Sequence, residues 1–73
     1  MDEYPIEVAG LPARANINGD GYFVNVAFQN VFIAGSPLVV HLNPPVATIE
    51  EVGGAALLGL VAAIASGAVI RPF

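Results

Sequence analysis

Cysteine, lysine and tryptophan are absent from this chain of 73 residues. Without cysteine there are no disulfides and no thiolate metal sites. Arg14 and Arg71 are the only basic residues, against six Asp and Glu, and the net charge is −4. Binding to nucleic-acid phosphates depends on clustered Lys and Arg, so this composition excludes an electrostatic nucleic-acid interface. We therefore expect no nucleic-acid partner.

Charge of either sign is scarce. Charged residues make up 11% of the chain and hydrophobic residues 56%, whereas soluble domains average about 25% and about 45–50%. A chain of this length forms one small domain, near the size at which a single core barely suffices. So few charges cover an isolated soluble monomer poorly. We expect lipid, identical copies or a larger assembly to cover part of the surface.

Targeting signals are also missing from the N-terminal residues. Met1–Pro5 has neither the basic region nor the apolar run of a secretory signal, and residue 2 is not a glycine that could be myristoylated. We therefore expect no secretory signal peptide, and a location in a membrane or a virion.

The first half of the chain predicts an antiparallel β-meander over about residues 6–42. Tyr22–Phe28 is the clearest strand, with Tyr22, Val24, Val26 and Phe28 expected on one face and the residues between them on the other. Asn18–Gly21 supplies the Asn-Gly and Asp-Gly pairs of a tight hairpin. The other expected strands are Ile6–Ala9, Ala13–Ile17, Val31–Ala34 and Leu38–Leu42, with a turn at Gly35–Pro37.

The second half predicts one long apolar helix over about residues 48–70. Thr48 and Glu51 fit a capping box, and Arg71 and Pro72 suit the C-terminal end. No side chain from Gly53 to Ile70 carries a charge. A helix from Ile49 to Ile70 would extend about 33 Å, close to the roughly 30 Å hydrocarbon core of a bilayer. We expect this helix to be transmembrane.

The expected fold is thus a small α+β protein in two parts. Residues 1–47 form a β-rich module that ends in the Pro44-Pro45 connector, and residues 48–73 form the apolar helix and a short tail. Tandem prolines fix the backbone and exclude helix before them, so they separate the two parts.

Small residues recur every four positions along the predicted helix, at Ala55, Gly59, Ala63 and Gly67. Such a stripe lets two helix backbones approach closely, and we interpret it as a helix-packing seam. The many glycines and alanines also make insertion into lipid only marginally favourable. Three environments therefore stay open for this helix: a membrane, a protein assembly, or the chain's own sheet.

Residues with reactive side chains are few and scattered. Asn16–Gly21 matches the first half of a calcium loop, but it offers one carboxylate, Asp20, and a hairpin turn explains it better. His41 has no nucleophile or second ligand near it in the sequence. Glu50 and Glu51 are explained by helix capping. We expect no catalytic, cofactor-binding or metal-binding residues and no small-molecule substrate, so the protein is not expected to be an enzyme.

Residues 48–71 resemble small coat subunits of filamentous phages, in which acidic residues precede a Gly/Ala-rich apolar helix with a basic end. Here a single arginine replaces the basic cluster, and the β-rich first half departs from that pattern. The resemblance implies packing of many copies. The sequence therefore favours a non-enzymatic structural subunit, anchored by its helix in a membrane or a multi-subunit complex such as a membrane-containing virion. The alternative is a soluble capsid, tail or cement protein whose helix is buried between neighbouring subunits.

Overall fold

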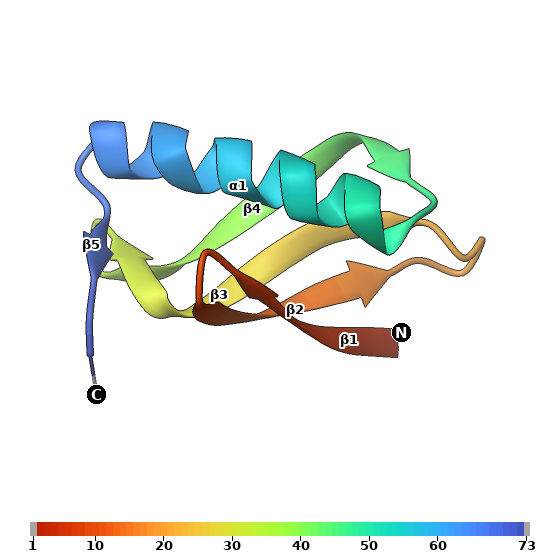
Figure 1. Cartoon of the computed structure of the whole chain (residues 1–73), viewed down its shortest axis with the longest axis horizontal. Helices are drawn as coiled ribbons and strands as arrows, with labels where there is room; N and C mark the ends of the chain where they lie inside the picture. The colour runs from red at the N-terminus through yellow and green to blue at the C-terminus, as the bar shows by residue number, and fades with distance from the viewer. Residues whose placement is uncertain (1, 73) are drawn as a thin grey trace.

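A computed structural model describes residues 2–72 and shows an antiparallel β-sheet with one helix packed across it (Figure 1). The strand order is β1-β2-β3-β4, and β5 pairs with β3. The prediction of a small α+β fold, with an antiparallel meander followed by one helix, is confirmed. In chain order the elements are β1 (Asp2–Val8), β2 (Leu11–Ile17), β3 (Phe23–Ile33), β4 (Ser36–Val46), α1 (Ile49–Ala65) and β5 (Val69–Ile70).

The strands are longer than the sequence predicts. Two predicted strands merge into β3, and β4 runs through Pro44 and Pro45, which we expected to form a separate connector. The register explains how the prolines fit. The pairing between β3 and β4 passes from His41 directly to Val46, so residues 42–45 form a bulge without partners in β3. No ladder hydrogen bond is therefore lost at either proline.

Two tight turns connect the outer strand pairs. Ala9 and Gly10 join β1 to β2 with φ of 52° and 80°, and Ala34 and Gly35 join β3 to β4 with φ of 52° and 81°. Two successive residues with positive φ are characteristic of the turn type that matches the twist of antiparallel strands. The turn expected at Gly35–Pro37 thus lies one residue earlier, at Ala34 and Gly35, and Ser36 and Pro37 already belong to β4. Both turns also place an alanine in this strained region.

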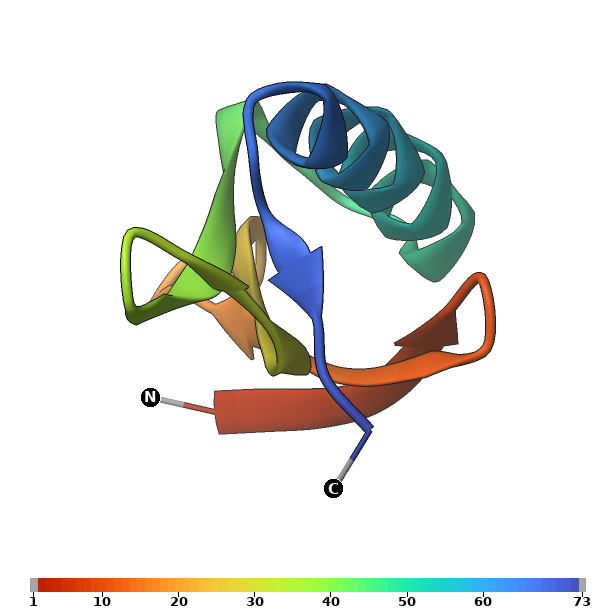
Figure 2. The same cartoon turned by 90° about the vertical axis from the view of Figure 1, so that its left-hand side faces the viewer.

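The core lies between α1 and the concave face of the sheet. Figure 2 shows the strands curling beneath the helix. Val52, Ala56 and Leu60 recur every four residues and form the buried side of α1. The sheet contributes its own buried apolar side chains, Val8, Ala13, Ala15, Phe23, Val26, Phe28, Val31, Leu38 and Leu42.

Gly59 lets α1 approach β4 closely. A Cβ atom at this position would overlap the side chain of Val40 in the middle of β4. The helix contacts this strand more extensively than any other. Glycine at position 59 therefore sets how deeply the helix sits on the sheet, and with it the depth to which Ala56 and Leu60 reach into the core.

The N-terminus of α1 agrees with the sequence, but its C-terminus does not. The capping box is present, with Thr48 Oγ1 accepting from the Glu51 backbone N–H and the Glu51 side chain accepting from the Thr48 N–H. The predicted extension to Ile70 is wrong, because the helix ends at Ala65. Gly67 adopts a φ of +107°. Its N–H donates to Ile64 O at 3.1 Å, and the Ala68 N–H donates to Ala63 O at 2.9 Å, which together form a Schellman cap.

After this cap the chain turns back to the sheet as β5. Val69 and Ile70 pair with Phe32 and Val31 of β3. Phe32 also pairs with Pro37 of β4, so β5 lies on the opposite edge of β3 from β4, the edge that β2 occupies further along. Two residues predicted to be helical therefore extend the sheet instead.

The prediction of a membrane span is not supported by this helix. With 17 residues, α1 extends about 26 Å at about 1.5 Å per residue, short of the roughly 30 Å hydrocarbon core. Within residues 2–72, no helix combines the length and the apolarity that crossing a membrane requires. The sequence-based estimate failed because the apolar run continues through the cap and into β5.

Asn30 holds the segment that follows β5. The Arg71 N–H donates to Asn30 O at 2.7 Å, and Asn30 Nδ2 donates to Arg71 O at 3.1 Å. The Arg71 guanidinium lies 5.7 Å from the centroid of the Phe32 ring, a cation–π contact. We expected Arg71 to cap the helix dipole, and this was wrong, because the arginine follows β5 and contacts β3.

We predict opposite effects of alanine at two helical glycines. Gly54→Ala meets open space and should raise the free energy of unfolding by up to about 1 kcal/mol, because alanine is the better helix former. Gly59→Ala should lower it by about 1–3 kcal/mol, because the new methyl overlaps Val40. Urea denaturation followed by circular dichroism measures both, and Gly54→Ala serves as the matched control.

A double variant tests the stated cause. Adding Val40→Ala removes the methyl groups that the new Cβ would meet, so the loss in Val40→Ala/Gly59→Ala should be smaller than the sum of the single losses. Additive losses, or a Gly59→Ala variant as stable as Gly54→Ala, would show that the close approach does not constrain the fold.

Candidate functional site

The predicted helix-packing seam lies largely against the chain's own sheet. Ala55 and Ala63 are half-buried and pack against the core, and Gly59 lies over Val40. Gly67 lies beyond the helix, in its C-terminal cap. The structure thus brings three of the four residues together on α1 and gives them a partner in β4. The use of this stripe as a seam with a second helix stays a prediction.

The side of α1 that points away from the sheet is also apolar. Leu58 is 75% exposed and Val61 is 58% exposed, although both are large aliphatic residues. Leu57 and Ile64 are exposed on the flank of the same surface. From Gly54 to the end of the helix no side chain on this surface carries a charge, while Glu50 and Glu51 are exposed in the first turn, at its N-terminal end. We call it the outer helix face, and it consists of Gly54, Leu57, Leu58, Val61, Ala62, Ile64 and Ala65.

Further exposed apolar residues follow the end of the helix. Val69 and Ile70 in β5 are both exposed, and Figure 1 shows β5 directly after the last turn of α1. The sequence does not single out the outer helix face, because every side of this helix is apolar and periodicity cannot separate the buried side from the exposed one. Only the packing of Val52, Ala56 and Leu60 on the sheet identifies the side that is left over.

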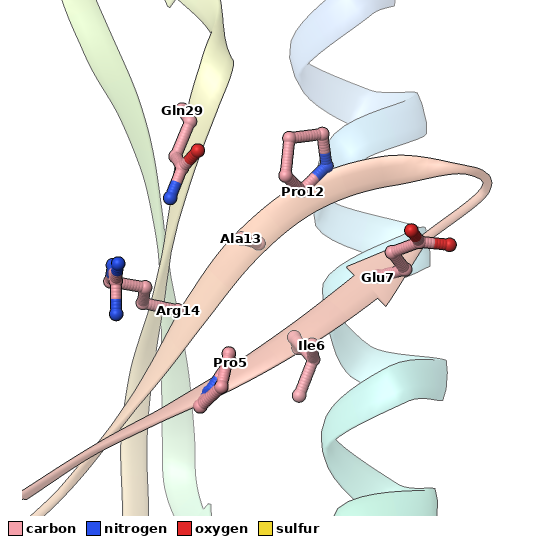
Figure 3. Close-up of a pocket in the computed structure, with 7 residues that line it drawn as sticks. All are labelled: Pro5, Ile6, Glu7, Pro12, Ala13, Arg14 and Gln29. Carbon is pink, nitrogen blue, oxygen red and sulfur yellow. The ribbon is translucent and has the colours of Figure 1, made fainter.

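The opposite face of the sheet carries an open hollow of about 370 Å³ on β1, β2 and β3. Figure 3 shows the residues around this hollow, with the Glu7 carboxylate and the Arg14 guanidinium at opposite sides of it and pointing apart. Seven residues line the hollow: Pro5, Ile6, Glu7, Pro12, Ala13, Arg14 and Gln29.

These residues do not form a catalytic arrangement. Arg14 Nη1 lies 3.6 Å from Glu3 Oε1, and both side chains are about half exposed. A surface ion pair of this kind contributes about 0–1 kcal/mol to stability. Among the lining residues there is no serine, cysteine or histidine to act as a nucleophile or as a base near neutral pH. The hollow is an open surface feature of mixed polar and apolar lining.

The half calcium loop at Asn16–Gly21 is a hairpin turn between β2 and β3. Asn18 Oδ1 accepts from the backbone N–H groups of Asp20 at 2.9 Å and Tyr22 at 3.0 Å. Asn16 Nδ2 donates to Asn25 Oδ1 across the strands. The side-chain oxygen that would face a cation at Asn18 is therefore directed into the turn itself. The hairpin interpretation of this segment is confirmed.

His41 lies in β4, exposed on the face away from the helix, with Asn25 as its strand partner. Across the part of the chain that the structure describes, no three His, Cys, Asp or Glu residues gather closely enough to hold a metal ion. The surface best suited to binding is thus an apolar one, the outer helix face, and not a chemically reactive cluster.

We expect Ca²⁺ to leave the turn at residues 16–21 unchanged. Calcium requires six to eight oxygen ligands, whereas the Asn18 side-chain oxygen already accepts two backbone hydrogen bonds. Amide chemical shifts of residues 16–22, recorded while Ca²⁺ is added to millimolar concentration, should stay constant. Saturable shifts confined to these residues would contradict this assignment of the turn.

Comparison of the chain with protein-family models, with curated proteins and with solved structures finds no match.

Proposed function

We propose that this protein is a small non-enzymatic assembly subunit whose outer helix face is covered by neighbouring protein subunits. The observation that supports this proposal is the exposure of Leu58 and Val61 on a helix surface without charge. Monomeric soluble proteins rarely expose contiguous apolar patches of this kind, and such patches commonly mark interaction sites.

Burial of the exposed aliphatic side chains would stabilise the proposed assembly. Complete burial of an aliphatic side chain such as Leu or Val contributes about 1.5–3 kcal/mol. The fold does not obtain this contribution from Leu58 or Val61, because α1 packs on the sheet through its other side. A neighbouring subunit that covers the outer helix face would obtain it. A virion or a multi-subunit complex supplies such neighbours in fixed positions.

Protein suits this face better than lipid does. Helices that lie in the membrane surface carry Lys and Arg along their polar side, where they meet anionic headgroups. Glu50 and Glu51 are the only charged residues of α1, and both are acidic. The earlier alternative of a soluble capsid, tail or cement protein, with its helix between neighbouring subunits, is therefore the form of the proposal that we favour over a membrane anchor.

Site-specific photo-crosslinking in the native assembly tests which molecule covers the face. With p-benzoylphenylalanine in place of Leu58, we expect adducts to other protein chains. The control carries the same group in place of Tyr22, which is exposed in the turn between β2 and β3, and should give far fewer adducts. Adducts to lipid alone at position 58, or equal protein adducts at both positions, would count against the proposal.

Polar substitution tests whether the exposed aliphatic side chains stabilise the proposed assembly. Leu58→Gln/Val61→Gln should reduce incorporation of the chain into its assembly, while the free energy of unfolding changes by no more than about 0.5 kcal/mol per site, since both side chains are exposed. Tyr22→Gln is the matched control for loss of an exposed apolar residue. Normal incorporation of the double variant would refute a role for the outer helix face.

A further inference from the structure

The two edge strands of the sheet differ in how they are protected. β1 pairs only with β2, and among residues 2–72 the only strand that pairs with β4 is β3. Each edge therefore presents backbone N–H and C=O groups, on alternate residues, to the surroundings. Natural proteins shield such edges with charges, prolines or bulges, because an open edge recruits another strand.

β1 is shielded against pairing with a second copy of itself. Pro5 lies at its centre and has no N–H to donate. Antiparallel pairing of two β1 strands about Pro5 would also place Glu3 of each copy opposite Glu7 of the other. Like charges directly across a strand pair are destabilising. Charge and proline thus both oppose pairing at this edge.

β4 lacks this protection between its prolines. From Leu38 to Leu42 there is no Asp, Glu, Lys, Arg or Pro, while Pro37 and Pro44 bound the segment. Leu38 and Leu42 are buried beneath α1. Val39, which is 40% exposed, and His41 point to the opposite face of the sheet. The central part of β4 is therefore an uncharged edge of five residues, in which Val39, Val40 and His41 pair regularly with β3 and Leu42 begins the bulge.

We propose that this edge pairs with the same edge of a second copy of the chain, antiparallel about a two-fold axis at Val40. In this register Val40 lies opposite Val40, and Leu38 lies opposite Leu42 on the helix side. On the other side Val39 lies opposite His41. Each pair joins residues without like charges, and β-branched residues in cross-strand pairs stabilise a sheet. The acidic residues of β1 are separated from the axis by β2 and β3.

The same asymmetry limits the association to a pair. A two-fold contact uses the open β4 edge of both copies. The edges that remain exposed are those of the β1 strands and of the β5 strands. β1 carries Asp2, Glu3, Pro5 and Glu7, and β5 is only two residues long, and both features oppose the recruitment of a further strand. The product is one continuous sheet that joins the two five-stranded sheets, with both helices on one face. This pairing involves a different surface from the outer helix face, so it does not depend on the proposed function.

Disulfide cross-linking tests both the contact and its register, and the chain has no cysteine to interfere. Residues directly opposite each other in antiparallel strands bring their Cβ atoms to about 4.5–5.5 Å, near the spacing of a disulfide, whereas diagonal neighbours are about 7–8 Å apart. A mixture of the Val39→Cys and His41→Cys chains should therefore form a mixed dimer. Each variant alone should form several-fold less.

The β1 edge offers the matched control. A mixture of Glu3→Cys and Glu7→Cys chains has the same geometry about Pro5 that Val39 and His41 have about Val40. We expect it to cross-link no faster than two cysteines that meet by diffusion. Equal cross-linking at the two edges would overturn the proposal, as would cross-linking of Val39→Cys with itself as fast as with His41→Cys.

Charge replacement tests the affinity. Val39→Lys/His41→Lys places lysines opposite each other in the dimer and should raise its dissociation constant by about tenfold or more. Val39→Glu/His41→Glu should do the same, and mixing the two variants should restore dimers by pairing Lys with Glu. Analytical ultracentrifugation of the full chain measures the dissociation constants of the Lys variant, of the Glu variant and of their mixture. Circular dichroism confirms that each variant is folded.

The outcomes separate this proposal from the proposed function. Leu58→Gln/Val61→Gln should leave the cross-link between positions 39 and 41 unchanged. Loss of the cross-link in that variant would show that copies meet through the helix and would overturn pairing at β4. A wild-type chain that sediments as a monomer at every concentration, or whose β4 pairs only with a different protein, would overturn it as well.

Discussion

The close contact between α1 and β4 at Gly59 determines the geometry of the whole molecule. Because no side chain separates the helix from Val40 at this point, the helix lies low on the sheet. Val52, Ala56 and Leu60 then reach the apolar face formed by four strands. In a chain this small, a single layer of contacts supplies nearly all of the burial. A helix held further away would leave that layer incomplete.

The helix is apolar on every side, but the core uses only one of them. The apolar residues of the helix therefore fall into two groups, one buried against the sheet and one exposed. The buried group is explained by packing on the sheet. The exposed group, the outer helix face, contributes nothing to the fold and is the strongest reason to regard the protein as a subunit of something larger. The proposed pairing through the edge of β4 would be a second, chemically different contact, formed by backbone hydrogen bonds instead of aliphatic side chains.

Local signals in the sequence predicted the local structure well. The capping box at Thr48 and the glycines at the turns identified where elements begin, because each acts through its immediate neighbours. The end of the helix was missed because Gly67 was interpreted as a packing residue, although glycine after a helix also adopts positive φ in a Schellman cap. The pairing of β5 with β3 and the path of β4 through Pro44 depend on distant residues, and one local pattern cannot reveal them. The candidate surfaces were missed for the same reason, since their exposure follows from packing.

The outer helix face also has a consequence for how this sequence can change over time. Leu58 and Val61 do not support the fold, so selection for stability alone would let polar residues accumulate there, whereas Val52 and Ala56 would stay apolar. The two sides of one helix are therefore subject to separate evolutionary constraints. Under the proposed assembly role, relatives without the partner would keep the buried side and diversify the outer one.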